Sequence, residues 1–207
     1  MRRLEYLPGA CLGGVRSLEM DEKKNLLEVR MLGGFQLIWQ GREFQVGKKQ
    51  TAKALRMLQI LLHAGTSGVS REQLLENLFG YDAEGDIANN LSVTVHYLRR
   101  LLRESCLPQE NYIHTKGGRY WFASSFPTEV DVLVFQKLID QAKGRPKEQR
   151  LSLLKRACRL YKGHFLPALA GEEWVTVAGA YYQNLYSECM EDLCHLMMEQ
   201  REYEELY

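Results

Sequence analysis

The sequence predicts an α+β region over residues 26–125 followed by an all-α region over residues 126–207. Three short strand-like runs open the first region, and turns that contain glycine separate them. Three helical patterns and then two more strand-like runs follow in the same region. After residue 126 the apolar residues recur only at helical spacing, so we expect helices there and no strand.

Length and charge agree with this division. The 207 residues are 45% hydrophobic and 26% charged, enough for one large core or two small ones. Residues 26–125 carry 12 Lys/Arg against 9 Asp/Glu, whereas residues 126–207 carry 10 against 13. A basic half joined to an acidic half suits a nucleic-acid reader that also faces a protein. Residues 1–25 lack clear periodicity and are predicted to form an N-terminal extension.

The sequence also bears on the compartment and on metal binding. No run approaches the roughly 18 apolar residues that span a bilayer, and no secretory signal opens the chain. Five cysteines without a CxxC pair indicate reduced thiols, so we expect a cytoplasmic protein that does not bind membranes. Cys189, Cys194 and His195 lie close in sequence, but their spacing puts the two thiols on different helix faces. We therefore expect core cysteines rather than a metal site, and no cofactor.

The first elements are short strands. They are expected at Leu27–Leu32, Phe35–Trp39 and Glu43–Val46, with turns at Gly33-Gly34 and Gln40-Gly41. The alternation of apolar and polar residues in the first run predicts a strand with one buried face.

Two helices are expected next. The first, Ala52–Ala64, has leucines at helical spacing and stops before Gly65, which can adopt a left-handed cap. The second, Ser70–Phe79, opens with the spacing of a capping box, in which the side chains of Ser70 and Gln73 accept from each other's backbone amides.

A third helix is expected from Asp86, a good N-cap, to about Arg103, after the loop Gly80–Gly85. At 100° per residue, one stripe must face the core, namely Ile87, Leu91, Val95, Leu98 and Leu102. The opposite face carries amide, aromatic, imidazole and guanidinium groups, and no acidic residue lies between Asp86 and Arg103. A surface helix that only needs solubility usually mixes charges of both signs.

A hairpin and further helices complete the chain. Tyr112–Thr115 and Arg119–Phe122 flank Lys116-Gly117-Gly118, which predicts a β-hairpin with a basic, glycine-built tip. Beyond it we expect helices at Asp131–Ala142, Pro146–Tyr161 and Glu172–Glu199.

A capped helix, a polar helix and a basic hairpin in this order predict a winged helix-turn-helix, whose second helix enters the major groove of DNA. Arg can bond guanine with two hydrogen bonds, Asn can bond adenine, and Val can contact the thymine methyl group. The residues predicted to contact DNA are Asn89, Asn90, Val93, Thr94, His96, Tyr97, Arg99, Arg100 and Arg103 of the helix, with Lys116 and Arg119 of the hairpin. Lys48, Lys49 and Lys53 are expected to add phosphate contacts.

Residues 27–122 resemble the response-regulator type of winged helix (OmpR/PhoB-like). The run from Asn89 to Leu102, NNLSVTVHYLRRLL, resembles its recognition helix, and the run from His114 to Tyr120, HTKGGRY, resembles its wing. His96 and Tyr97 stand where that family often has Ser and Arg, so its base preferences are not carried over. By this resemblance, the loop Gly80–Gly85 lies where the family contacts RNA polymerase, and an ordinary connection is the alternative interpretation.

The second region resembles the bacterial transcriptional activator domain of SARP-type regulators, the antibiotic regulatory family. The resemblance rests on Asp131 with Phe135, on Leu160–Pro167 (LYKGHFLP) and on Glu173-Trp174. It implies TPR-like helix pairs and a sequence-specific transcriptional activator that binds promoter repeats as two copies, a possible homodimer, with RNA polymerase as a partner. Residues 201–207 resemble the opening of another helix, so we expect the domain over 126–207 to be truncated, because helical repeats stack on their neighbours.

Two other classes of function, an enzyme and a protein-interaction adaptor, are the alternatives to DNA binding. The sequence has no GxxxxGK(S/T) phosphate loop, HExxH zinc motif or GxSxG elbow, so we expect no enzymatic activity. The stronger alternative is a protein-interaction adaptor whose winged helix has lost DNA affinity. An exposed surface that joins the basic residues of the third helix and the hairpin favours DNA. A buried Arg100, or one paired with carboxylates of the helical region, favours the adaptor or an autoinhibited form.

Overall fold

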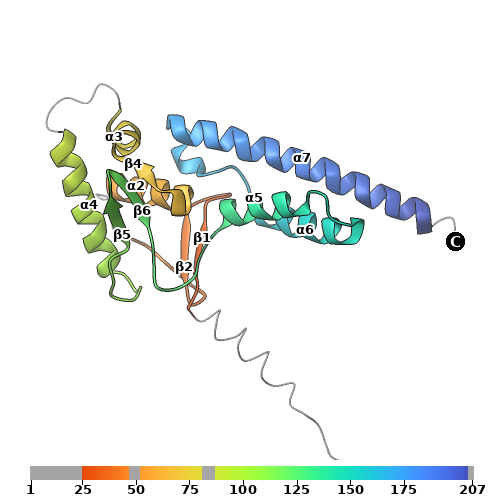
Figure 1. Cartoon of the computed structure of the whole chain (residues 1–207), viewed down its shortest axis with the longest axis horizontal. Helices are drawn as coiled ribbons and strands as arrows, with labels where there is room; N and C mark the ends of the chain where they lie inside the picture. The colour runs from red at the N-terminus through yellow and green to blue at the C-terminus, as the bar shows by residue number, and fades with distance from the viewer. Residues whose placement is uncertain (1–24, 47–51, 81–86, 205–207) are drawn as a thin grey trace, which may run out of the picture.

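The computed structural model describes residues 25–46, 52–80 and 87–204. At one end of the molecule, two small sheets pack with three helices, and three further helices extend away from them (Figure 1). This is the predicted order of an α+β region followed by an all-α region. None of the helices in the described ranges is both long and apolar enough to cross a membrane.

The first sheet has the strand order β3-β2-β1-β7. β1 (Leu27–Arg30), β2 (Gln36–Trp39) and β3 (Arg42–Phe44) form the antiparallel meander that the glycine turns predict. β7 (Thr128–Val130) pairs in parallel with β1, so the prediction that no strand follows residue 126 is wrong. Three residues are too few to show a period of two, and pairing with the edge of β1 holds this strand in place. The division between residues 125 and 126 stays a prediction, and it falls just before a strand of the first sheet.

The helix-turn-helix forms where the sequence predicts it. α2 (Ala52–Ala64) is followed by the short 3₁₀ helix η2 (Gly65–Ser67) and by α3 (Arg71–Phe79). The capping box is confirmed, because Ser70 Oγ accepts from the Gln73 amide and Gln73 Oε1 accepts from the Ser70 amide. α4 (Ile87–Arg103) comes next. The predicted Asp86 cap, and the loop before it from residue 81 on, lie outside the described residues.

The second sheet, β4-β6-β5, contains the predicted hairpin. β5 (Ile113–Lys116) and β6 (Arg119–Phe122) are antiparallel and joined by Gly117-Gly118, whose φ angles are +57° and +76°. A two-residue turn with both φ angles positive matches the twist of the strands, and glycine adopts it without strain. Lys116 therefore ends β5 opposite Arg119, rather than lying in the turn itself.

A two-residue strand ties this hairpin to the helix-turn-helix. β4 (Val69–Ser70), too short to be predicted, pairs with β6, and the Arg71 amide donates to the Gly118 carbonyl at 2.8 Å. Just before β4, Gly68 has φ +62°, and a Cβ atom there would lie 2.7 Å from the Tyr120 carbonyl oxygen. The turn can approach β6 this closely only because residue 68 has no side chain.

After β7, the second region is helical. α5 (Asp131–Ala142) and α6 (Lys147–Leu160) form a helix pair, and α7 (Glu173–Glu204) packs along both of them (Figure 1). The loop between α6 and α7 holds the 3₁₀ helix η3 (Pro167–Leu169). The side chains buried in this region include Phe135, Leu138, Leu154, Ala157, Tyr182, Cys189, Leu193 and Leu196.

Asp131, at the start of α5, joins the two regions. Its carboxylate accepts from the backbone amides of Met31 and Leu32 at 2.8–2.9 Å and from that of Val132 at 2.8 Å. Burial raises the pKa of this carboxyl, against the lowering effect of the amide donors. The Leu166 amide donates to the Met31 carbonyl at 2.9 Å, which adds a second connection at the end of β1.

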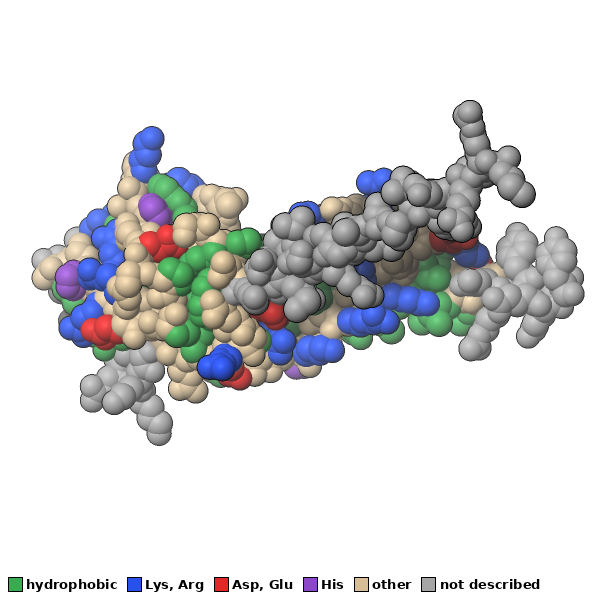
Figure 2. All heavy atoms as spheres, turned by 90° about the horizontal axis from the view of Figure 1, so that it is seen from below, with side chains coloured by type: hydrophobic (Ala, Val, Ile, Leu, Met, Phe, Trp, Pro, Cys, Tyr) green, Lys and Arg blue, Asp and Glu red, His purple; other side chains and the backbone are tan. Residues whose placement is uncertain are grey.

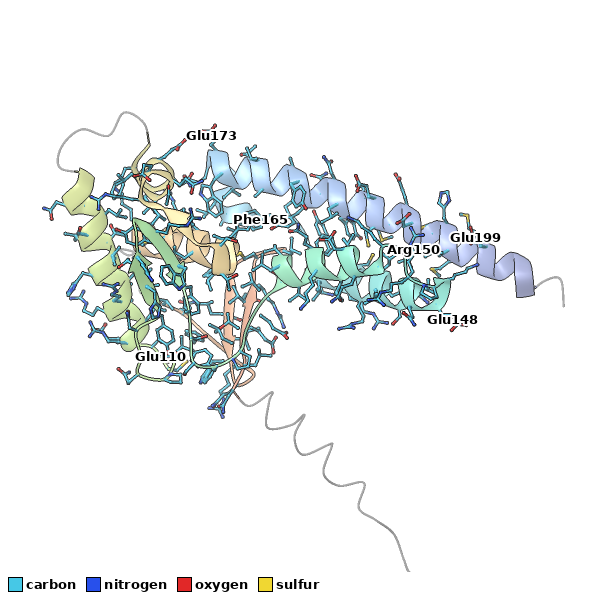
Figure 3. All side chains as sticks on the ribbon, in the orientation of Figure 1. Glu110, Glu148, Arg150, Phe165, Glu173 and Glu199 are labelled. Carbon is cyan, nitrogen blue, oxygen red and sulfur yellow. The ribbon has the colours of Figure 1, made fainter. Side chains whose placement is uncertain are left out.

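His63, in the last turn of α2, forms the other part of the junction. Its ring lies 5.1 Å from Phe165, 6.0 Å from Trp174 and 5.8 Å from Tyr182, measured between ring centres. Its Nε2 atom lies 3.0 Å from the Tyr182 hydroxyl. Burial lowers the pKa of His63 to about 4, so the imidazole is neutral at pH 7. In Figure 3, the labelled Phe165 lies where the two regions meet.

Candidate nucleic-acid interface

α4 is amphipathic, as the sequence predicts. Leu91, Leu98 and Leu102 are fully buried, and Val95 is almost so. The side chain of Ile87 lies outside the described residues. This stripe anchors α4 on α2 and α3 and thereby fixes which side of the helix faces outward.

Thr94 does not belong to the outward side. Its side chain is 8% exposed, and its hydroxyl donates to the Asn90 carbonyl at 2.8 Å. A hydroxyl bonded to its own helix in the core is not directed at a base edge, so the structure gives no support to the predicted DNA contact of Thr94. Thr94 lies three residues after Leu91 and four before Leu98, so helical spacing alone could have assigned it to the core.

The outward side of α4 is exposed. The members that we call the outer face are Asn89, Asn90, Val93, His96, Arg100 and Arg103. Val93 is 59% exposed, which leaves its methyl groups in solvent on a helix that already buries an apolar stripe. Tyr97 is half-buried beside this face. Ser92 is exposed as well, and the sequence reasoning missed it, although it lies one turn after Asn89.

The exposure and the ion-pair partner of Arg100 bear on whether the protein binds DNA or acts as an adaptor. Its side chain is 53% exposed, and its guanidinium lies 4.7 Å from the centre of the Tyr97 ring. Its carboxylate partner is Glu104, one turn along the chain, with a nitrogen–oxygen distance of 3.8 Å. An exposed pair of this kind contributes about 1 kcal/mol at most, so another anion can replace Glu104. Among the residues that the structure describes, no carboxylate of the helical region forms an ion pair with Arg100.

Arg99 lies on a different side of α4 and is half-buried. Its Nε and Nη2 atoms donate to the Ile113 carbonyl at 3.2 and 2.6 Å. This contact ties α4 to β5. In this structure Arg99 therefore positions α4 against β5, and its predicted DNA contact stays a prediction.

The two cations of the hairpin also differ. Arg119 donates through Nη2 to the Ser67 carbonyl at 2.8 Å and to the Gly68 carbonyl at 3.1 Å. It therefore fastens β6 to the turn before α3, although its side chain is exposed. Lys116 is exposed and forms no ion pair with any residue in the described ranges. Of the two, only Lys116 has a charged group free to meet a phosphate.

The outer face lies away from the helical region. α4 occupies one end of the molecule and α5–α7 extend from the other side of the winged helix, with α2 and the sheets between them (Figure 1). Lys and Arg side chains gather at the end that α4 occupies (Figure 2). Neither α5, α6 nor α7 covers α4 (Figure 1).

The remaining predicted phosphate contacts lie near α2. Lys48 and Lys49 are outside the described residues. Lys53 is exposed in the first turn of α2, and its Nζ atom lies 4.4 Å from the centre of the Phe79 ring. A lysine held over a ring keeps its charge at the surface.

The cysteines near residue 190 lie on different sides of α7, as their spacing predicts. Cys189 is buried and Cys194 is exposed. Within the described ranges, no three His, Cys, Asp or Glu side chains come together in a group that could hold a metal ion.

Two family models match the chain, in the order of its two regions. The model for the transcriptional regulatory protein C-terminal domain matches residues 47–119, and the model for the bacterial transcriptional activator domain matches residues 130–207. The chain belongs to the transcriptional regulators that join these two domains. The predicted SARP-type arrangement, an OmpR/PhoB-type winged helix followed by an activator domain, is therefore confirmed.

A solved structure with the same fold supports this arrangement. The regulator is similar to EmbR of Mycobacterium tuberculosis, solved in complex with a low-affinity phosphopeptide, with a TM-score of 0.67 and 17% identity. The likeness covers 83% of this chain and 45% of the EmbR chain, so the regulator spans less than half of that protein. At this identity the likeness establishes the fold alone. A comparison with curated proteins gives no significant match.

Proposed function

We propose that this regulator binds double-stranded DNA sequence-specifically, with α4 in the major groove and the β5–β6 hairpin as the wing. The observation that carries the proposal is the outer face of α4, whose members are exposed and include no acidic residue. The helix that carries this face lies at the end of the molecule away from the helical region (Figure 3).

The chemistry of the outer face suits base edges. Arg100 can donate two hydrogen bonds to guanine, and Asn89 or Asn90 can pair with adenine. The exposed methyl groups of Val93 offer a contact to the methyl group of thymine. His96 lies between these residues on the same face and can donate or accept.

Contacts to the DNA backbone would come from elements other than α4. Lys116 at the end of β5 has a free ammonium group, and we propose that it binds a phosphate beside the groove. Lys53, exposed at the start of α2, can do the same. These contacts fix the register of the helix and carry no sequence information.

We further propose that two copies bind repeated half-sites and that the regulator activates transcription through RNA polymerase. Both proposals rest on the family and not on a contact in the molecule. The adaptor alternative receives less support, because Arg100 is exposed and forms no ion pair with the described part of the helical region.

Selection of bound duplexes from a random pool tests the proposal. The full chain is used, because Asp131 and Phe165 complete the packing of the winged helix. Selection at two salt concentrations is expected to return one consensus with repeated half-sites, and the affinity should fall as salt rises. A pool with no consensus, or no binding at low salt, would contradict sequence-specific recognition.

A further inference from the structure

A pair of thiols lies between two helices of the activator domain. Cys158 of α6 and Cys189 of α7 have their sulfur atoms 3.4 Å apart. Cys189 is 2% exposed, and Cys158 is half-buried. A disulfide needs a sulfur–sulfur distance of about 2.05 Å, so the atoms have to approach by little more than 1 Å.

We propose that Cys158 and Cys189 are a modification site, at which a peroxide forms a reversible disulfide that links α6 to α7. This inference does not depend on DNA binding, because neither residue lies near the outer face of α4.

The reaction balances in two steps. The Cys158 thiolate attacks one oxygen of the peroxide, so that an S–O bond forms, the O–O bond breaks, and the leaving oxygen departs as hydroxide or alkoxide. The Cys189 sulfur then attacks the Cys158 sulfenic acid, which forms the S–S bond and breaks the S–O bond, and the thiol proton leaves with the released hydroxide as water. The two sulfur atoms are oxidised together by two electrons, and the peroxide is reduced by two.

The surroundings of the two thiols indicate which of them reacts first with the peroxide. Burial, with the hydrogen bond to Cys158, raises the pKa of Cys189 to about 12, so this thiol is a poor first nucleophile. Cys158 is partly accessible to a small oxidant. Cys189 is then held against the sulfenic acid, where it competes well with thiols in solution.

The other described cysteines lack such a partner. Cys106 and Cys194 are exposed, and among the described residues neither is paired with another cysteine as Cys158 is with Cys189. Cys194 is five residues after Cys189 and lies on the far side of α7. The two exposed thiols therefore serve as internal controls.

The crosslink would close the segment that holds Phe165 and Trp174, both of which contact His63. It should stabilise the activator domain against heat without altering the outer face. A closed loop of about 30 residues and the size of this chain give an expected rise in Tm of about 5–10 °C.

The test exposes the full chain to hydrogen peroxide, blocks the remaining thiols under denaturing conditions, and identifies disulfide-linked peptides by mass spectrometry without reduction. Cleavage after Glu188 and Glu191 separates Cys189 from Cys194. We expect a peptide with Cys158 joined to one with Cys189, and a Tm rise that a reducing agent reverses.

Matched variants complete the test. Cys158→Ser and Cys189→Ser should each abolish the linked peptide and the Tm rise, whereas Cys194→Ser should keep both. Cys189→Ala serves in place of the buried serine variant if that one fails to fold. The proposal is overturned if both thiols stay free after peroxide treatment, or if Cys158 is recovered joined to Cys106 or Cys194 instead.

Discussion

The arginines of the winged helix differ in what their guanidinium groups contact. Arg99 and Arg119 donate to the carbonyl groups of Ile113, Ser67 and Gly68. Among the described residues, Arg100 contacts an exposed carboxylate and a tyrosine ring. The sequence predicted one role for all of them, because residue type does not indicate which backbone carbonyl lies within reach. The outer face could be predicted from spacing, and the two positioning arginines could not.

Alanine substitutions of Arg100 and Lys116 should weaken DNA binding in different ways. Arg100→Ala is expected to cost about 1–3 kcal/mol on the selected duplex and much less on unrelated DNA, if the residue reads a guanine. Lys116→Ala should weaken binding to all duplexes alike and reduce the salt slope by about one. Titrations at several salt concentrations measure both effects. An equal loss on every duplex for Arg100→Ala would assign this residue to a phosphate.

His63 should make the stability of the regulator depend on pH. Its pKa is about 4 in the folded protein against 6.5 for the free side chain. Between these two pKa values, His63 is protonated in the unfolded chain and neutral in the folded protein. The contribution of His63 to the free energy of unfolding is therefore fully present above pH 6.5 and is lost as the pH drops towards 4. Between pH 7 and pH 5 this residue should cost about 2 kcal/mol.

Urea unfolding at the two pH values measures the effect. His63→Gln keeps a polar partner for Tyr182 and cannot titrate, so its stability should fall less between pH 7 and pH 5 than that of the unchanged protein. The same fall in both proteins would show that other groups control this range.

At the scale of elements, the long periodic segments were predictable and the short strands were not. α2 and α5 have the predicted bounds, because apolar spacing and capping residues act within the element itself. β4 and β7 have two and three residues, and each exists only because a partner strand lies beside it. Pairing across the chain carries no local pattern. The wing could be predicted because its glycine turn is a local pattern in the sequence.

The contact between the wing and the helix-turn-helix should depend on Gly68. Alanine there would place Cβ 2.7 Å from the Tyr120 carbonyl oxygen, in a backbone conformation that disfavours side chains. Gly80 has nearly the same backbone conformation, with φ +78° and ψ 175° against +62° and −178° for Gly68, but open space around it, which makes it a matched control. Gly68→Ala should cost about 1–3 kcal/mol more than Gly80→Ala in urea unfolding. Equal costs would mean that conformation alone, and not the close contact, sets the requirement for glycine.

At the scale of the molecule, the two regions are joined by buried contacts. Asp131 holds the end of β1, and the ring of His63 lies among three aromatic side chains of the second region. Arg56 and Glu172 form a salt bridge of 2.5 Å across the same junction. The uneven charge along the sequence predicted two parts with different partners, but it could not predict how the parts pack.

This junction predicts that the winged helix depends on the activator domain. A chain of residues 1–125 lacks β7 and Asp131, and it exposes His63 and the end of β1. It should therefore unfold at a lower temperature than residues 1–207, which should melt in one transition. Calorimetry of both chains measures this. Two separate transitions in the whole chain, with one at the Tm of the shorter chain, would mean that the regions are independent.

The central claim is that the outer face of α4 reads bases in the major groove, and methylation interference tests it most directly. Methylation at guanine N7 modifies the major groove and leaves the minor groove unchanged. On the selected duplex, we expect methylated guanines within each half-site to block binding of the regulator, and Arg100→Ala to lose this sensitivity at one position. The account would be contradicted if methylation at every guanine N7 left binding unchanged. It would also be contradicted if binding were disturbed only by changes in the minor groove.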